Sequence, residues 1–185
     1  MARWISILAH PFVTAPLTVG IIASRIGGPG EAARTLIIFL VVAVVPGAIL
    51  MVYNVRRGAW DNVDASKVSE RPILFAVAIL STLVLLAWFT IVRPQPVLVR
   101  GIVGFLAMTV VCAATTRWVK VSLHVACAAF AATTLILLGS AVGWALAFLV
   151  PALAWSRWAL GRHTSLEPAL GALVGIAAGL GCYFI

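Results

Sequence analysis

The sequence predicts an all-α polytopic membrane protein, a bundle of six to seven transmembrane helices. Hydrophobic residues make up 63% of the 185 positions and charged residues only 10%, and the mean hydropathy is +1.14. Apolar runs of roughly 20 residues, the length that crosses a hydrocarbon core, recur along the chain. These runs are continuous rather than alternating with polar residues, so helices are expected and the strands of a membrane barrel are not.

Seven apolar segments divide the chain, and the breaks between them carry glycine, proline or charge. The predicted spans are 5–24, 35–53, 72–92, 97–115, 121–139, 141–157 and 167–185. Pro11 and Pro16 interrupt the first span, so a re-entrant or interfacial course is its alternative. Because no long linker separates the spans, residues 1–185 are expected to form one domain.

The last span carries Gly171, Gly175 and Gly179 at four-residue spacing. This spacing places the three glycines on one side of a helix, where they let a second helix approach closely. The pattern therefore predicts helix packing rather than a binding site.

The most informative ionisable cluster lies between the sixth and seventh spans. Arg157, His163 and Glu167 fall within eleven positions at the mouth of an apolar helix. Ionisable groups are costly in a membrane unless water, a partner or a substrate compensates them. The i, i+4 spacing of His163 and Glu167 lets the carboxylate fix the orientation of the imidazole. This combination indicates transfer of a phosphoryl group to histidine.

Two further polar clusters lie in the loop 54–72 and at the start of the fifth span. Two predicted spans separate Arg71 from Lys120, and two more separate His124 from Arg157. Because an even number of crossings returns the chain to the same side, all three clusters are expected on one membrane face. With seven crossings, that face also holds nine of the thirteen lysines and arginines: Arg3, Arg56, Arg57, Lys67, Arg71, Arg117, Lys120, Arg157 and Arg162.

Such a shared face can bind and transfer a phosphoryl group. Arginine matches phosphate oxygens with a planar fork, so Arg71 and Arg157 are candidate phosphate ligands together with Lys67 and Lys120. His163 is the candidate nucleophile, and a second histidine, His124, is the candidate acid and base. No metal ion or other cofactor is required for this chemistry.

Together the three clusters resemble the motifs of the type 2 phosphatidic acid phosphatase family, in its divergent small bacterial members. The residues that carry the resemblance are, in motif order, Lys67-Val68-Ser69-Glu70-Arg71-Pro72, then Ser122-Leu123-His124, then Ser156-Arg157 with His163 and Glu167. The resemblance covers most of the chain from residue 67 onward, and the third motif is its most specific part.

The resemblance implies a role for each of these residues. His163 would become phosphorylated, Glu167 would orient it, and His124 would serve as acid and base. The implied phosphate ligands are Arg71, Arg157, Lys67 and Ser122. The resemblance therefore implies that the protein is a metal-independent membrane phosphatase that hydrolyses a lipid phosphate or a prenyl diphosphate.

Three departures from the family pattern stand out. The lysine lies four residues before Arg71 rather than the usual seven, and Asp64 occupies the usual lysine position. This spacing makes Lys120 the alternative phosphate ligand. The second motif lacks its proline and its glycine, and glutamate replaces aspartate at position 167.

Other classes of function remain as alternatives. Asp61 and Asp64 faintly resemble the aspartate-rich loop of intramembrane prenyltransferases, but those enzymes need a second such loop and no aspartate follows Asp64. A transporter or scaffold protein is the other alternative, although no internal repeat is evident. His10 has no partner in the pattern and is interpreted as structural. The basic residues lie at span ends, which favours membrane lipids over nucleic acid as the partner.

The expected location is the inner or plasma membrane, in a multi-pass arrangement. The nine-to-four distribution of lysine and arginine favours a cytoplasmic position for the three clusters. Lys67, Arg71 and Arg157 are candidate phosphate ligands, however, and without them the distribution is six to four. The sequence does not predict an oligomeric state.

Overall fold

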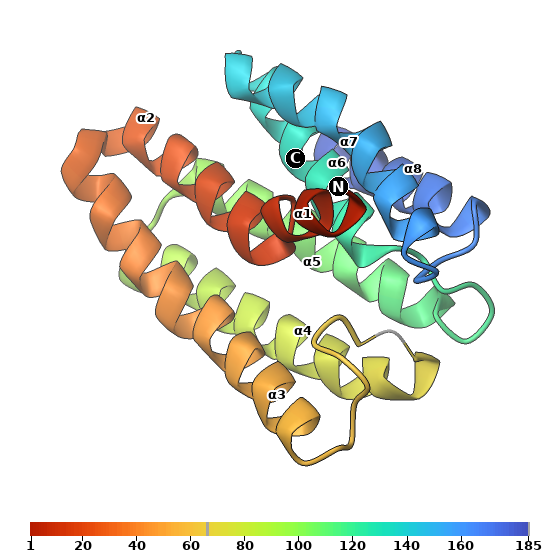
Figure 1. Ribbon diagram of the computed structural model, residues 1–185. Coiled ribbons are helices and arrows are strands. Elements are labelled where there is room, and N and C mark those ends of the chain that lie inside the picture. Colours follow the sequence, from red (N-terminus) through yellow and green to blue (C-terminus); the bar gives the residue numbers. More distant parts are fainter. Residues whose placement is uncertain (66, 185) are drawn as a thin grey trace.

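The protein is all-α and polytopic, as the sequence predicts. The structure is a computed structural model, and it describes residues 1–65 and 67–184. Its helices, in chain order (Figure 1), are α1 (Ala2–Leu8), α2 (Pro11–Phe39), η1 (Leu40–Val44), α3 (Val45–Arg56), η2 (Val68–Glu70), α4 (Arg71–Ala87), η3 (Trp88–Val92), α5 (Pro96–Thr115), α6 (Leu123–Leu137), α7 (Ala141–Ala159) and α8 (Leu166–Phe184). Five helical stretches are long and apolar enough to cross a membrane: Ala2–Arg56, Val68–Val92, Pro96–Thr115, Ala141–Ala159 and Leu166–Phe184.

The first of these stretches bends into two arms. Gly28 has a φ of 74°, a left-handed conformation that glycine adopts without steric cost, and Pro29 begins the second arm. The first arm runs from Pro11 to Gly27, which at 1.5 Å per residue is about 25 Å long. The chain then returns through α2, η1 and α3, so the two arms are two separate passes through the bundle (Figure 1).

The predicted first span, 5–24, is wrong at its start. Helix α1 ends at Leu8, and His10 caps a new helix by accepting a hydrogen bond from the amide of Phe12, from N to Nδ1, at 3.1 Å. Pro11 is the first residue of that helix, where the missing amide hydrogen has no cost. Thus α1 is a separate short helix, and the first pass starts at Pro11.

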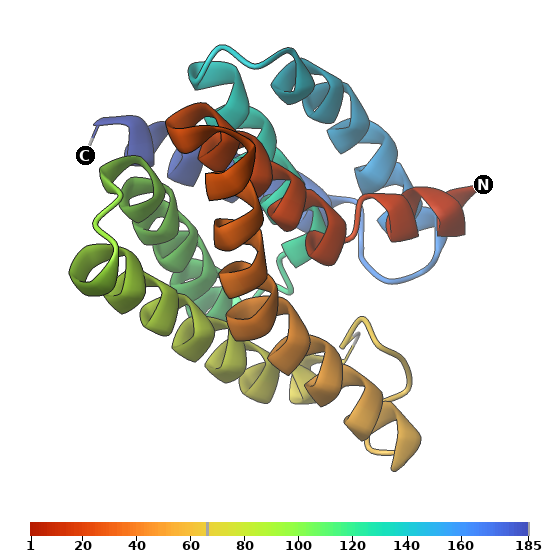
Figure 2. The same ribbon diagram turned by 90° about the vertical axis from the view of Figure 1, so that its left-hand side faces the viewer.

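Helix α6 is the centre of the bundle. It is only 15 residues long, two shorter at each end than the predicted span 121–139, and eleven of its residues are buried. A helix that is apolar on all sides is expected to be surrounded by other helices. With α6 included, the described residues make seven passes, and the start of α1 and the end of α8 lie on opposite sides of the molecule (Figure 2).

The glycine ridge of α8 packs against α6, which confirms the predicted packing role. A Cβ atom added at Gly175 would lie 2.3 Å from the carbonyl oxygen of Ala126, and one at Gly171 would lie 2.7 Å from that of Ser122. A backbone atom cannot move aside as the end of a side chain can. The close approach therefore requires glycine at these positions.

We expect Gly175→Ala to lower the melting temperature of the protein in detergent. Forcing one extra carbon into a packed core typically costs about 1–3 kcal/mol. Gly181→Ala is the matched control on the same helix, because nothing lies within 4 Å of a Cβ added at Gly181. Alanine is a better helix former than glycine by about 1 kcal/mol, so the control should melt at the same temperature or higher. If both variants melt alike, the α6–α8 packing is not as described.

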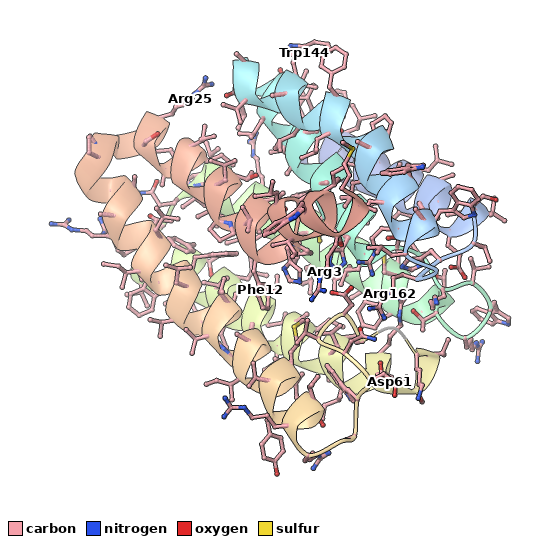
Figure 3. The ribbon with its side chains drawn as sticks, viewed as in Figure 1. Arg3, Phe12, Arg25, Asp61, Trp144 and Arg162 are labelled. Atoms are coloured by element: carbon pink, nitrogen blue, oxygen red, sulfur yellow. The ribbon has the colours of Figure 1, made fainter. Side chains whose placement is uncertain are left out.

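The loops between passes form two polar ends. Arg93 pairs with Glu31 at 3.1 Å, and the Arg25 guanidinium donates to the carbonyl oxygen of Leu138, so the α2 bend and two distant loops meet at one end. The labelled side chains of Asp61 and Arg162 lie at the other end, away from Arg25 (Figure 3). This second end, called the site end below, comprises His10, the segments 57–65 and 67–70, and the loops 116–122 and 160–165.

Candidate active site

His163 and Glu167 form a close pair at the site end. The chain turns after α7 through Gly161, which has a φ of 64°, and this turn places His163 just before α8. Glu167 Oε2 lies 2.9 Å from His163 Nδ1 and also accepts the amide hydrogen of Thr164 at 3.0 Å. His163 is only 7% exposed. Since Glu167 occupies Nδ1, Nε2 is the ring nitrogen that remains for a ligand.

The environment of His163 disfavours its protonated form. Burial lowers the pKa of His163 below its ordinary value of 6.5, and the charges of Arg71, Arg157 and Lys120 lower it further. The hydrogen bond that the Glu167 carboxylate accepts from the ring acts in the opposite direction and raises the pKa. The net direction is downward, so the imidazole is neutral at pH 7, the form in which Nε2 can act as a nucleophile.

We expect a titration of the His163 ring, followed by NMR of labelled histidine, to have its midpoint below pH 6.5. Glu167→Gln removes the group that favours the imidazolium, so the midpoint should move to still lower pH. Spectra of single histidine variants would assign the signals of the three histidines. A midpoint at or above 6.5, or a shift to higher pH in Glu167→Gln, would show that this description of the site's charge is wrong.

Two buried arginines flank this pair. Arg71 is the first residue of α4, is 5% exposed, and donates from Nη1 to the carbonyl oxygen of Val121 at 2.9 Å. Arg157 lies in the last turn of α7 and is 1% exposed. Its Nη1 donates to Asp64 Oδ2 and to Ser6 Oγ, both at 2.8 Å. Charged groups are almost never this buried without a function or a partner.

The loop before α6 is hydrogen-bonded to the segment that carries His163 and Glu167. Lys120 Nζ donates to the carbonyl oxygen of Arg162 at 2.7 Å, and the Ser122 amide donates to the carbonyl oxygen of Glu167 at 3.2 Å. Burial lowers the pKa of Lys120, as do the nearby arginines, while Glu167 raises it. The hydroxyl of Ser122 is fully buried and has no hydrogen-bond partner among residues 1–65 and 67–184.

These contacts join all three sequence clusters at the site end. Arg71 from the first cluster reaches Val121 beside the second, and Lys120 and Ser122 reach the third. The three clusters therefore meet at one end of the helix bundle, which is the arrangement that a shared membrane face requires.

The structure does not bring Lys67 into the site. Its side chain is 59% exposed and its Nζ lies 2.8 Å from Asp61 Oδ2. The backbone amides of Lys67 and Asp61 both donate to the buried Glu70 carboxylate, which fixes this part of the loop away from the arginines. The predicted placement of Lys67 as a phosphate ligand is thus not supported by geometry, and Lys120 is the lysine close to His163.

Two residues without a predicted role lie beside His124. The Asp64 carboxylate has Oδ1 3.8 Å from His124 Nε2, and the ring of His10 meets the ring of His124 edge-on at 4.7 Å between centroids. The sequence offered one signal for Asp64, because it stands seven residues before Arg71. His10 gave no such signal, since only the fold of α1 and α2 carries it to this end.

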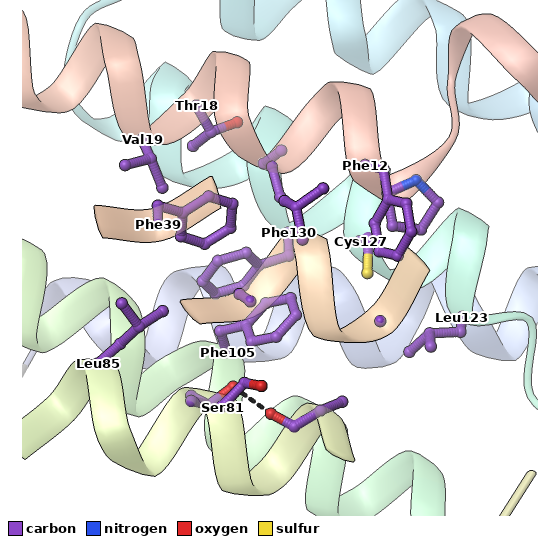
Figure 4. A pocket seen from close by; sticks show the side chains of 18 of the residues that line it. Phe12, Thr18, Val19, Phe39, Ser81, Leu85, Phe105, Leu123, Cys127 and Phe130 are labelled. Atoms are coloured by element: carbon purple, nitrogen blue, oxygen red, sulfur yellow. Dashed lines mark hydrogen bonds between the residues drawn. The ribbon is translucent and has the colours of Figure 1, made fainter. Parts of the chain in front are cut away.

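A cavity of about 190 Å³ extends from the polar cluster into the space between the helices. Its polar end is lined by His10, Asp64, Arg71, His124, Arg157 and His163. The remainder is almost entirely apolar and lies between α2, α4, α5 and α6, where Phe12, Phe39, Phe105 and Phe130 turn toward the shared space (Figure 4). On α4 and η3 the lining runs from Arg71 to Phe89, a stretch of 19 residues, or about 27 Å of helix. This length approaches the thickness of a hydrocarbon core, roughly 30 Å.

Among residues 1–65 and 67–184, His10, Asp64 and His124 could together hold a metal ion, since their ligand atoms lie within 4.8 Å of one another. A cation there would meet the Arg157 guanidinium, which already pairs with Asp64. His10 Nδ1 is also engaged by the amide of Phe12. The charges around the cluster therefore favour an anion over a divalent cation.

No protein-family model matches the chain, and neither a curated protein nor a solved structure does.

Proposed function

We propose that the chain is a membrane phosphatase that hydrolyses a lipid phosphate or prenyl diphosphate through a phosphohistidine on His163, without a metal ion. The observation that carries the proposal is the position of the His163–Glu167 pair. It lies beside two buried arginines at the polar end of an apolar cavity of membrane-spanning helices. The resemblance of the three clusters to type 2 phosphatidic acid phosphatases supports the same activity.

The cavity suits a ligand with a charged head and a hydrocarbon chain. Arg71 and Arg157 would bind the phosphate oxygens, with Lys120 adding charge and the free hydroxyl of Ser122 offering a donor. The apolar part, whose lining runs from Leu74 to Phe89 along α4 and η3, would receive the acyl or prenyl chain. Transfer to a histidine mainly requires that the reacting groups be positioned and the charge on the equatorial oxygens be stabilised, and arginines provide this stabilisation.

The two histidines would divide the chemistry. His163 Nε2 attacks phosphorus while Glu167 holds Nδ1, and the bond to the leaving oxygen breaks as His124 protonates it. His124 then removes a proton from water, which attacks phosphorus, and the bond to His163 breaks to release inorganic phosphate. The net reaction is hydrolysis of one phosphate ester or anhydride bond.

The test is release of inorganic phosphate by purified protein in detergent with EDTA present. Phosphatidate, phosphatidylglycerol phosphate and prenyl diphosphates make up the panel. At least one of them should be hydrolysed, at a rate that added Mg²⁺ leaves unchanged. Absence of turnover on the whole panel, or activity that depends strictly on Mg²⁺, would contradict the proposal.

We further propose that the protein lies in the inner or plasma membrane of the cell and that the site end faces the cytoplasm. The seven passes place the N-terminal Arg3 at the site end, together with the eight other basic residues of the nine-to-four majority. Ala59→Cys at the site end and Pro94→Cys at the opposite end, each in a background without the native cysteines, would test this orientation. In intact cells an impermeant maleimide should label only the Pro94→Cys protein. Labelling of only the Ala59→Cys protein would place the site outside.

A further inference from the structure

We propose that Asp64 is a positioning residue for His124, so that each histidine of the site has its own carboxylate. This inference rests on the proposed phosphatase function and assigns Asp64 a role that no sequence motif gave it. The position is informative because the phosphatase motif has a lysine there, and the charge is reversed in this chain.

The first observation is the direction of the His124 ring. His124 is 8% exposed, and its Nε2 is inaccessible to solvent, with no hydrogen-bond partner in the described part of the chain. Asp64 Oδ1 lies 3.8 Å from this nitrogen. Hydrogen bonds in an empty site are often long and tighten when the ligand binds. With Nε2 facing Asp64, Nδ1 is the nitrogen that faces the substrate.

The same division is seen at His163, with the nitrogens exchanged. Glu167 lies 2.9 Å from Nδ1 of His163 and leaves Nε2 for phosphorus. A carboxylate on one nitrogen fixes the ring and stabilises its imidazolium while the other nitrogen transfers the proton, which is the logic of a histidine–aspartate pair. His163 needs its carboxylate for orientation during attack, and His124 needs one because it must carry a proton in a cavity that Arg71 and Arg157 also line.

The second observation is how firmly Asp64 is held. Arg157 binds Oδ2 at 2.8 Å, which leaves Oδ1 to face His124. The Asp64 amide donates to Asn62 Oδ1 at 3.0 Å. The next residue, Ala65, is fully buried with a φ of 47°, a conformation that is uncommon for residues other than glycine. Strain of this kind persists only where the surroundings enforce it and often accompanies a functional position.

Asp64 therefore acts through His124 in both halves of the reaction. In the first half, the proton on His124 Nδ1 passes to the leaving oxygen as the phosphorus–oxygen bond breaks, while Nε2–H stays on the Asp64 side. In the second half, Nδ1 accepts a proton from the attacking water as the bond to His163 breaks. The Asp64 carboxylate stabilises the imidazolium of His124 each time it forms.

Substrates that differ in their need for an acid test this role. The 4-nitrophenolate group leaves without a proton, whereas the alkoxide of dodecyl phosphate needs one. The quantity to compare is kcat/KM, which covers the steps through phosphorus–oxygen cleavage, for Asp64→Asn and wild type on both substrates. Asp61→Asn is the matched control, because Asp61 lies in the same loop with its side chain 59% exposed and paired with Lys67.

Asp64→Asn should lower kcat/KM for dodecyl phosphate on the order of a hundredfold and that for 4-nitrophenyl phosphate by less than about threefold. Asp61→Asn should leave both within about threefold, since its carboxylate lies outside the site. Partial misfolding would lower kcat/KM for the two substrates by the same factor, so the ratio of the two kcat/KM values would not change. Equal losses on the two substrates in Asp64→Asn, or the same change of ratio in Asp61→Asn, would overturn the role of Asp64. If wild type hydrolyses neither these substrates nor any lipid phosphate, the proposed function falls and this inference falls with it.

Discussion

His163→Ala is expected to abolish both turnover and the covalent phosphoenzyme. Alanine has no nitrogen to attack phosphorus, and the loss of a nucleophile costs on the order of a thousandfold or more. The variant should still bind vanadate, because Arg71 and Arg157 remain. Steady-state phosphate release and vanadate inhibition or binding would measure the two effects separately.

Thr164→Ala is the control for this change, because Thr164 is the exposed neighbour of His163 and its side chain lies outside the cavity lining. It should retain near wild-type turnover. An active His163→Ala protein would mean that another residue is the nucleophile.

Arg157→Lys should lower kcat/KM on the order of a hundredfold to a thousandfold, the typical loss when one donor to a developing charge is removed. Lysine keeps the charge but has no planar fork, so it cannot hold Ser6 and Asp64 and also face a phosphate. Arg157→Ala should in addition lower the free energy of unfolding by about 3–5 kcal/mol, because it leaves the Asp64 carboxylate without its buried partner. Kinetics and thermal unfolding in detergent would measure these effects.

Arg56→Lys is the matched control, because Arg56 is an exposed arginine outside the cavity lining. Arg56→Lys should change neither kcat/KM nor the free energy of unfolding appreciably. If Arg157→Lys behaves like Arg56→Lys, the buried guanidinium has no role beyond its charge.

The sequence alone was sufficient to predict the passes because their signal is hydrophobic length. Six of the seven predicted spans correspond to single helical passes, most with ends shifted by one or two residues. The second pass is longer than its predicted span, 35–53, because it begins at Pro29 and ends at Arg56. The error at the first span arose because residues 5–8 are as apolar as those that follow. Only the cap formed by His10 and Pro11 separates α1 from α2.

The site could be predicted in outline because it depends on parity and spacing. Counting spans placed Arg71, His124 and His163 on one face, and the i, i+4 spacing placed Glu167 on His163, at 2.9 Å in the structure. Neither rule fixes the course of an irregular loop. Residues 57–65 and 67–70 are arranged by the buried Glu70 carboxylate and by the Arg157–Asp64 pair, so that Lys67 points outward and Asp64 inward.

The contact between His10 and His124 could not be predicted from a sequence pattern. His10 lies 114 residues from His124 in the sequence, so their contact follows from how the first arm of α2 packs beside α6. The sequence predicted a structural histidine, and the cap on Phe12 agrees with that interpretation. Its position against His124 is an additional consequence of the fold.

The most direct test of the account is to look for phosphate on the protein during turnover. Wild-type protein would be mixed, in the presence of EDTA, with a lipid phosphate from the panel that it hydrolyses. The phosphoryl group of this substrate would carry the label. The reaction would be quenched in alkali, in which phosphohistidine survives, and the label mapped by mass spectrometry. The account predicts phosphate on His163 at early times and none in His163→Ala. Two results would contradict the phosphohistidine mechanism: release of phosphate while no label is found on the protein, or label on a residue other than His163.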